Sequence, residues 1–122
     1  MALSEAQKQE WEKTLRELEL ISEEDALEEH TAGSYWWLAS QTRGNFFFTK
    51  EKFIFISGLG FDNYAIKYSD IRAIKKSVVG PFIPAITVTA FVPEKGKEKR
   101  YKCSVWKRQK WIDLLCKKSG IN

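Results

Sequence analysis

The chain has 122 residues, of which 43% are hydrophobic and 14% aromatic, and its formal net charge is +4. This length allows one domain with a single core, and the aromatic content predicts that rings fill much of it. The apolar runs are shorter than the roughly 20 residues of a membrane-spanning helix, and no secretory signal pattern opens the sequence, so we expect a cytoplasmic protein.

Charge is distributed unevenly along the chain. Residues 1–33 carry three basic and ten acidic side chains, a net charge of −7, whereas residues 34–122 carry seventeen basic and six acidic ones, a net charge of +11. Either the acidic segment lies against the basic domain, or the two surfaces meet different partners. We therefore divide the chain into an acidic N-terminal helical extension, 1–33, and a domain, 34–122.

A helix is predicted to begin at Ser4, which stands three residues before Gln7 in the pattern of a capping box. Trp11, Leu15 and Leu18 follow at helical spacing and form a narrow apolar stripe on a charged helix that runs to about residue 19 or further. Such a stripe must be covered. It can pack on the chain's own domain, pair with a second copy in a homodimer, or close over a ligand groove as a lid.

After residue 33 the pattern becomes extended. Short runs rich in aromatic and β-branched residues predict seven strands, separated by turn signals such as segments 43–45 and 58–60. Because the connections are short, neighbouring strands should be antiparallel. The predicted strands are 34–41, 46–49, 53–57, 64–68, 71–76, 85–92 and 99–105.

Helical spacing returns from residue 106 to about residue 119. Trp111, Ile112 and Leu115 form a stripe that should be buried, and Gly120 is well placed to end the helix. The predicted fold is α+β and mainly β, with helices at both ends. The side chains expected in its core are Trp37, Phe47, Phe53, Phe55, Ile71, Ile74, Val88, Trp111 and Leu115.

Two segments make the predicted fold more specific. The run 43–58, RGNFFFTKEKFIFISG, resembles the central hairpin of GRAM domains and of bacterial pleckstrin-homology-like (PH-like) proteins, and 65–74, AIKYSDIRAI, resembles their next signature. The resemblance covers about residues 34–118. It implies a seven-stranded antiparallel barrel closed by the C-terminal helix, a non-catalytic role, and binding of phosphoinositides, other anionic lipids or protein segments. PH domains bind lipid with several basic residues around the first hairpin, whereas the matching loop here, 41–44, offers only Arg43.

Basic residues cluster elsewhere, in the last predicted hairpin and at the start of the C-terminal helix. On an anionic membrane each could contribute up to about 1 kcal/mol of salt-sensitive attraction. They could equally serve as solubilising residues that guard an edge strand. Lys75 and Lys76 would extend the cluster. The candidate anion-binding residues are Lys95, Lys97, Lys99, Arg100, Lys102, Lys107 and Arg108.

The sequence offers little for catalysis. His30 is the single histidine and stands beside two glutamates in a predicted linker, while Cys103 and Cys116 are expected to be reduced thiols within the fold. No metal-ligand spacing or phosphate-binding loop is present, so we expect no enzyme activity, cofactor or metal. The expected function is peripheral association with anionic lipid at the inner face of the membrane, or an adaptor role. A protein scaffold or homo-oligomer is the alternative, and nucleic-acid binding ranks below both.

Overall fold

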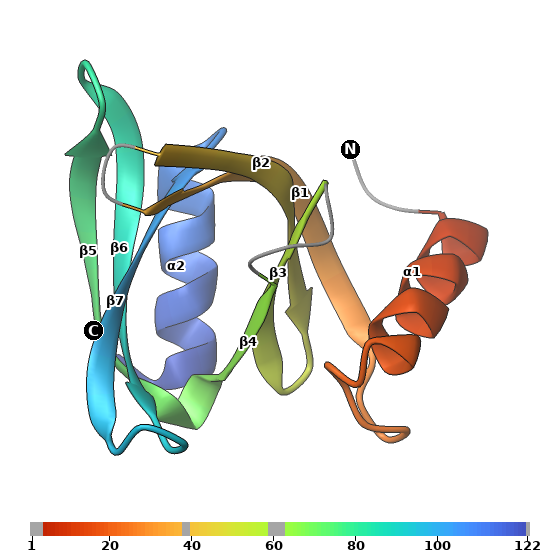
Figure 1. Cartoon of the computed structure of the whole chain (residues 1–122). Coiled ribbons are helices and arrows are strands. Elements are labelled where there is room, and N and C mark those ends of the chain that lie inside the picture. The colour runs from red at the N-terminus through yellow and green to blue at the C-terminus, as the bar shows by residue number, and fades with distance from the viewer. Residues whose placement is uncertain (1–3, 38–39, 59–62, 122) are drawn as a thin grey trace.

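The computed structural model describes residues 4–37, 40–58 and 63–121 (Figure 1). It contains helices at both ends and seven strands between them, as the sequence predicts; the predicted turn at 58–60 lies mostly outside the described residues. The elements are α1 Glu5–Glu17, β1 Leu27–Trp37, β2 Ser40–Thr49, β3 Lys52–Ser57, β4 Tyr64–Lys67, the 3-10 helix η1 Tyr68–Asp70, β5 Ile71–Val79, β6 Ile83–Val92, β7 Lys97–Val105 and α2 Arg108–Ser119.

The strands form one antiparallel sheet in the order β4-β3-β2-β1-β7-β6-β5. Strand β1 pairs with β2 from Leu27 to Trp37, but with β7 only from Gly33 to Trp36. Figure 1 shows the sheet curling around α2, with β1 to β4 on one side of the helix and β5 to β7 on the other. The short pairing of β1 with β7 therefore joins the two halves of the sheet.

Two facing glycines allow the backbones to approach closely where the halves meet. Gly33 of β1 lies opposite Gly44 of β2. A Cβ atom on Gly33 would lie 2.6 Å from the carbonyl oxygen of Ser104, and one on Gly44 would lie 2.2 Å from that of Ile56. Only glycine fits such a contact. The turn predicted at 43–45 is therefore wrong, because this glycine lies inside a strand.

The main core lies between the curled sheet and α2. Its largest buried side chains include Phe46, Phe48 and Phe55, and the ring of Phe48 stacks on Trp111 with 4.8 Å between centroids. Burying one such ring stabilises the fold by about 1.5–3 kcal/mol. Trp111, Ile112 and Leu115, the predicted stripe of α2, are all buried, and Gly120 ends the helix with a left-handed φ of 77°.

Helix α1 covers the opposite face of β2 and β3. Leu15 is fully buried in a cluster with Phe47 and Ile54, and the ring centroid of Trp11 lies 4.7 Å from that of Phe47. Because the second half of β2 and the strand β3 are covered on both faces, residues 46–48 and 53–56 are apolar runs without polar alternation. The stripe of α1 is thus covered within the same chain, except for Leu18, which remains 45% exposed.

The acidic segment 1–33 is not helical throughout. Helix α1 ends at Glu17, and the last residues of the segment, from Leu27 on, belong to β1. Glu28 pairs with Lys118 of α2, and the Glu29 carboxylate lies 3.6 Å from the Nζ atom of Lys110. Part of the acidic segment therefore lies against the basic domain, which is one of the two explanations that the charge asymmetry allows.

The strand predictions at the first hairpin need correction. The predicted strand 34–41 spans the end of β1 and the start of β2, and 46–49 is only the second half of β2. Trp37 was expected in the core but is 57% exposed, whereas its neighbour Trp36 is buried. Successive residues of a strand point to opposite faces, so the prediction placed the wrong one of two adjacent tryptophans in the core. The other predicted core residues are buried, with Ile74 partly so.

Candidate functional site

The predicted anion-binding residues do not form one site. They fall into four places along β7, the turn before it and the start of α2. Alternation along β7 separates them, because Tyr101 and Cys103 point into the core while Arg100 and Lys102 point to the outer face. Lys95 and Lys97 lie on the exposed β6–β7 hairpin, Lys99 lies on the side of Tyr101, and Lys107 and Arg108 open α2.

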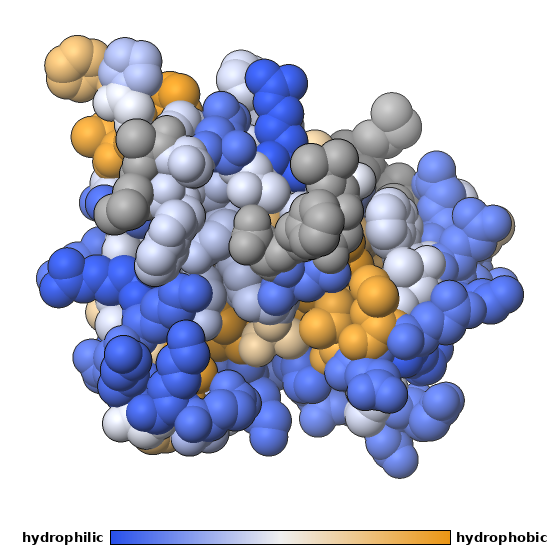
Figure 2. Space-filling view, in the orientation of Figure 1, coloured by the Kyte–Doolittle hydropathy of each residue, from blue (hydrophilic) through white to orange (hydrophobic). Residues whose placement is uncertain are grey.

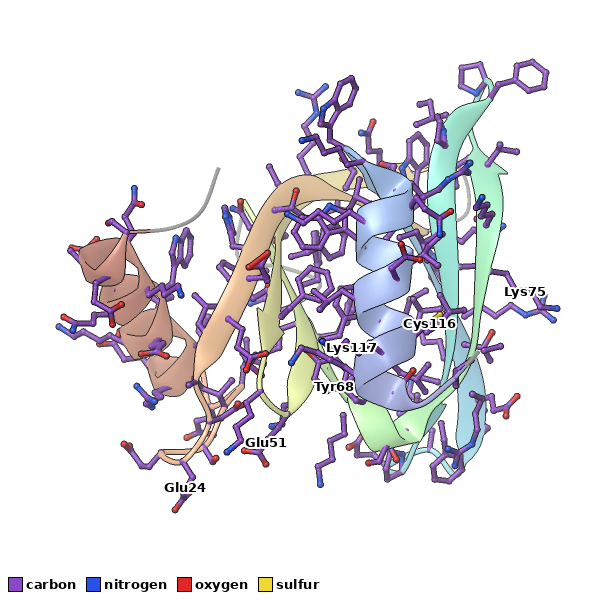
Figure 3. The ribbon with its side chains drawn as sticks, turned by 180° about the vertical axis from the view of Figure 1, so that it is seen from behind. Glu24, Glu51, Tyr68, Lys75, Cys116 and Lys117 are labelled. Carbon is purple, nitrogen blue, oxygen red and sulfur yellow. The ribbon has the colours of Figure 1, made fainter. Side chains whose placement is uncertain are left out.

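Arg100 and Lys102 belong to a basic surface shared by three strands. Lys102 lies opposite Thr87, which lies opposite Lys75, so one row crosses β7, β6 and β5. Arg100 lies opposite Thr89 in the next row. Figure 3 shows Lys75 extending away from α2. We call this surface the outer basic face; it comprises Lys75, Ser77, Thr87, Thr89, Arg100 and Lys102.

The outer basic face has the chemistry of an anion site. These residues, with Ala73 and Lys76, line a shallow groove of about 380 Å³, and none of the acidic side chains that the structure describes lines it. Among the described residues, no salt bridge neutralises Lys75, Arg100 or Lys102. The hydroxyl of Thr87 donates to that of Ser77 at 2.8 Å, so the Ser77 hydroxyl keeps its own proton to donate beside the cations. A phosphate or carboxylate placed here would meet positive charge and hydrogen-bond donors together.

The side chain of Arg108 forms hydrogen bonds within the fold. Its Nη1 atom donates to the carbonyl oxygen of Ser77 at 2.9 Å and lies 3.4 Å from that of Ala85, so the first turn of α2 is tied to the β5–β6 hairpin. Its guanidinium is thus partly engaged within the chain. Lys107, just before it, is exposed and adopts a left-handed φ of 57°.

Lys99 is surrounded by aromatic rings. Its Nζ atom lies 5.0 Å from the ring centroid of Tyr101, 5.3 Å from that of Trp37 and 6.0 Å from that of Tyr35. Cation–π contacts at these distances favour the charged side chain where it lies. Lys99 therefore stands apart from the outer basic face, on the side of the sheet that Tyr101 occupies.

An aromatic surface lies beside the start of α2. Trp106 is 82% exposed at the edge of a groove of about 770 Å³, which is lined by Ile83, Pro84 and Val105 together with basic residues. Phe82, next to Ile83 in the β5–β6 turn, is 87% exposed. Figure 2 shows hydrophobic residues gathered at the end of this hairpin. We call this surface the aromatic corner; it comprises Val78, Phe82, Ile83 and Trp106, with Lys76, Lys107 and Arg108 around it.

Sequence reasoning did not single out Phe82. A signal was available, because the ring stands in the segment Gly80-Pro81-Phe82, where polar or small residues are the rule. That the turn with Phe82 and the start of the helix with Trp106 lie at one end of the molecule is visible only once the chain is folded (Figure 1).

The residues considered for catalysis are used in packing. Cys103 is buried, and burial raises the pKa of its thiol to about 12, although the nearby Tyr64 hydroxyl lowers it in part. The prediction that His30 lies in a linker is wrong, because His30 belongs to β1. Its Nε2 atom lies 2.9 Å from Oδ1 of Asn45, and its ring packs beside those of Trp11 and Phe47. Among the described residues, no three His, Cys, Asp or Glu side chains are grouped as metal ligands.

Within the described parts of the chain, neither helix has the length and apolar character needed to cross a membrane. No protein-family profile and no curated protein matches the sequence. Among solved structures, the fold is similar to the crystal structure of the C-terminal domain of an unknown protein from Leishmania infantum. The TM-score is 0.69 at 18% sequence identity, and the match covers 91% of this chain and 95% of that one.

Proposed function

We propose that the protein is a non-catalytic binding module with a PH-like or GRAM-like barrel, and that it associates peripherally with anionic lipid at the cytoplasmic face of a membrane. The fold supports the barrel. The meander β1–β4 and the meander β5–β7 are joined by the pairing of β1 with β7. The C-terminal helix packs inside the curl of the sheet. This arrangement agrees with the order of elements that the sequence resemblance implies.

The outer basic face is the observation that carries the function. Lys75 of β5 and Arg100 and Lys102 of β7 project on either side of β6, and among the described residues no carboxylate lines the groove between them. Close to an anionic membrane each cation contributes about 1 kcal/mol, and the attraction falls within a Debye length, so three or four of them give reversible and salt-sensitive attachment. The acidic helix α1 lies at the opposite end of the molecule and leaves this face open (Figure 1).

Co-sedimentation with vesicles tests the proposal. Phosphatidylcholine vesicles with increasing phosphatidylserine should bind the full chain in proportion to their anionic content, and binding should weaken as salt is raised. The double variant Arg100→Gln, Lys102→Gln should lose most of this binding. The matched control is Lys95→Gln, Lys97→Gln, which removes the same charge from the far hairpin and should retain most of it.

Two outcomes would argue against this function. Equal losses in the two double variants would mean that net charge alone drives binding, without a site. Absence of binding by the unmodified chain would favour the alternative, a protein-interaction scaffold. Self-association through α1 is not needed to cover its stripe, because Trp11 and Leu15 already pack on the chain's own sheet.

A further inference from the structure

The turn of the β5–β6 hairpin holds an aromatic ring in an unfavourable place. Phe82 has a φ of 72°, in the left-handed region that favours glycine, and its side chain is 87% exposed. A bulky residue with such a φ is an outlier, since the Cβ atom crowds the backbone there. Neither packing nor local geometry explains why this position carries phenylalanine. A strained and exposed residue of this kind points to a function outside the fold.

The hairpin that carries Phe82 is firmly supported. Trp36, Val79 and Ala85 form a buried cluster beneath the turn, and the indole N–H of Trp36 donates to the Ser104 hydroxyl at 3.0 Å. The N–H of Phe82 itself donates to the carbonyl oxygen of Gly80 at 3.0 Å. The ring is therefore presented at the end of a braced hairpin.

Trp106 is presented on the same side of the molecule. Its carbonyl oxygen accepts a hydrogen bond from the indole N–H of Trp111 at 2.9 Å, and Arg108 ties the next turn to β5 and β6. Figures 1 and 3 both place the β5–β6 turn and the start of α2 at one end of the structure. Trp106 lines the apolar groove of Ile83, Pro84 and Val105, and Phe82 directly precedes Ile83 in the chain.

We infer that the aromatic corner inserts into the interfacial region of an anionic bilayer, with Phe82 and Trp106 as the inserted rings. This inference rests on the proposed function and adds an orientation to it. Aromatic rings are favoured at the boundary between headgroups and acyl chains, and basic side chains around them pair with lipid phosphates. Lys76 and Lys107 line the corner, and within residues 4–37, 40–58 and 63–121 no acidic side chain does.

The charge pattern favours a bilayer over a protein partner. Lys76 lines the grooves of both the aromatic corner and the outer basic face, so the two grooves meet at the edge strand β5, although Lys75 and Lys76 point to opposite faces of the sheet. A membrane in contact with the inserted rings would therefore also approach the cations of β5 and β7. Insertion and electrostatic attraction then act at neighbouring surfaces that meet at β5, each adding to the other.

The first test is the affinity for phosphatidylcholine–phosphatidylserine vesicles at near-physiological salt, where charge is partly screened. Phe82→Gly removes the ring at a position that suits glycine, and should weaken binding by about tenfold or more. Leu18→Ala, which removes an exposed apolar side chain from α1, should bind as the unmodified chain does. Unchanged affinity of the Phe82 variant would overturn the inference, while salt-sensitive binding through Arg100 and Lys102 would still support the proposed function.

The second test locates the indole. In vesicles with brominated acyl chains, the fluorescence of the unmodified chain should be quenched, and Trp106→Phe should abolish most of that quenching with little loss of binding. Trp37→Phe is the matched control and should keep it. Quenching that survives in Trp106→Phe would overturn the inference. So would a chain that self-associates in gel filtration and becomes monomeric on Phe82→Gly, since the corner would then bind a second copy.

Discussion

The carboxylate of Asp25 accepts a hydrogen bond from the hydroxyl of Thr49 at 2.7 Å, although 24 residues separate them. The Asp25 side chain is only 1% exposed, and its other oxygen accepts from the backbone N–H groups of Ala26 and Glu51 at 2.8 and 3.1 Å. A buried carboxylate is tolerated because these donors replace water. The contact ties the connection between α1 and β1 to the turn between β2 and β3.

Replacing Asp25 should therefore destabilise the whole fold. We expect Asp25→Ala to lower the free energy of unfolding by about 3 kcal/mol, because it leaves buried donors without an acceptor. Urea denaturation followed by tryptophan fluorescence would measure this loss. Glu24→Ala is the control: its side chain is exposed and points outward (Figure 3), so its unfolding midpoint should stay close to that of the unmodified chain.

Phe82→Gly should stabilise the protein. Relief of the left-handed strain is partly offset by the greater freedom of glycine in the unfolded chain, which leaves a gain of about 0.5–1 kcal/mol. Thermal unfolding should shift upward by a few degrees. Phe82→Ala keeps a Cβ atom and hence the strain, so it should show no such gain. A loss of stability in Phe82→Gly would mean that the ring contributes to packing after all.

Substitutions at Arg108 and Lys107 should differ in effect: the first should lower stability and the second should weaken vesicle binding. Arg108→Gln removes hydrogen bonds to the carbonyl groups of Ser77 and Ala85, and we expect it to cost about 1–2 kcal/mol of stability. Lys107→Gln removes only an exposed charge, so it should weaken vesicle binding with little change in stability. Denaturant titrations and vesicle binding of the two variants would check this contrast. Equal stabilities would show that the guanidinium contacts add little.

The stability of the fold should decline in alkali because of Cys103. Burial raises the pKa of this thiol from the ordinary 9.0 to about 12, so the folded chain keeps a proton that the unfolded chain loses. This contribution is complete below pH 9 and falls by up to about 1.4 kcal/mol per pH unit as the pH rises toward 12. Urea midpoints at pH 8 to 10 should fall less steeply in Cys103→Ala, whereas parallel curves would contradict this origin.

The elements that depend on local sequence could be predicted well. In the capping box, Oγ of Ser4 lies 3.2 Å from the Gln7 N–H and Oε1 of Gln7 lies 3.0 Å from the Ser4 N–H, as the spacing indicates. The buried stripe of α2 and its glycine end are also confirmed. Each of these features depends on residues within one or two turns of a helix, where spacing and residue type carry the information.

Features that depend on distant contacts could not be predicted. A glycine in the sequence indicates a turn, yet Gly44 owes its position to a close approach of Ile56 from the next strand. Trp36 and Trp37 are adjacent aromatic residues, and alternation alone does not say which one faces a buried cluster. The seven candidate basic residues are close in sequence, but strand alternation and the start of α2 distribute them over different surfaces.

The short pairing of β1 with β7 has a consequence for the order of folding. The ladder from Gly33 to Trp36 pairs β1 with the distant strand β7, and beside it the Trp36 side chain bonds to Ser104, 68 residues away. Strands β2 and β3, by contrast, meet across a two-residue turn. Closing a long loop costs more entropy and tends to occur late. Pulse-labelling hydrogen exchange during refolding should therefore protect the amides of β2 and β3 before those of the β1–β7 ladder. Until that ladder closes, the chain would pass through a state in which the meander β1–β4 and the meander β5–β7 are separate and each leaves an apolar face exposed.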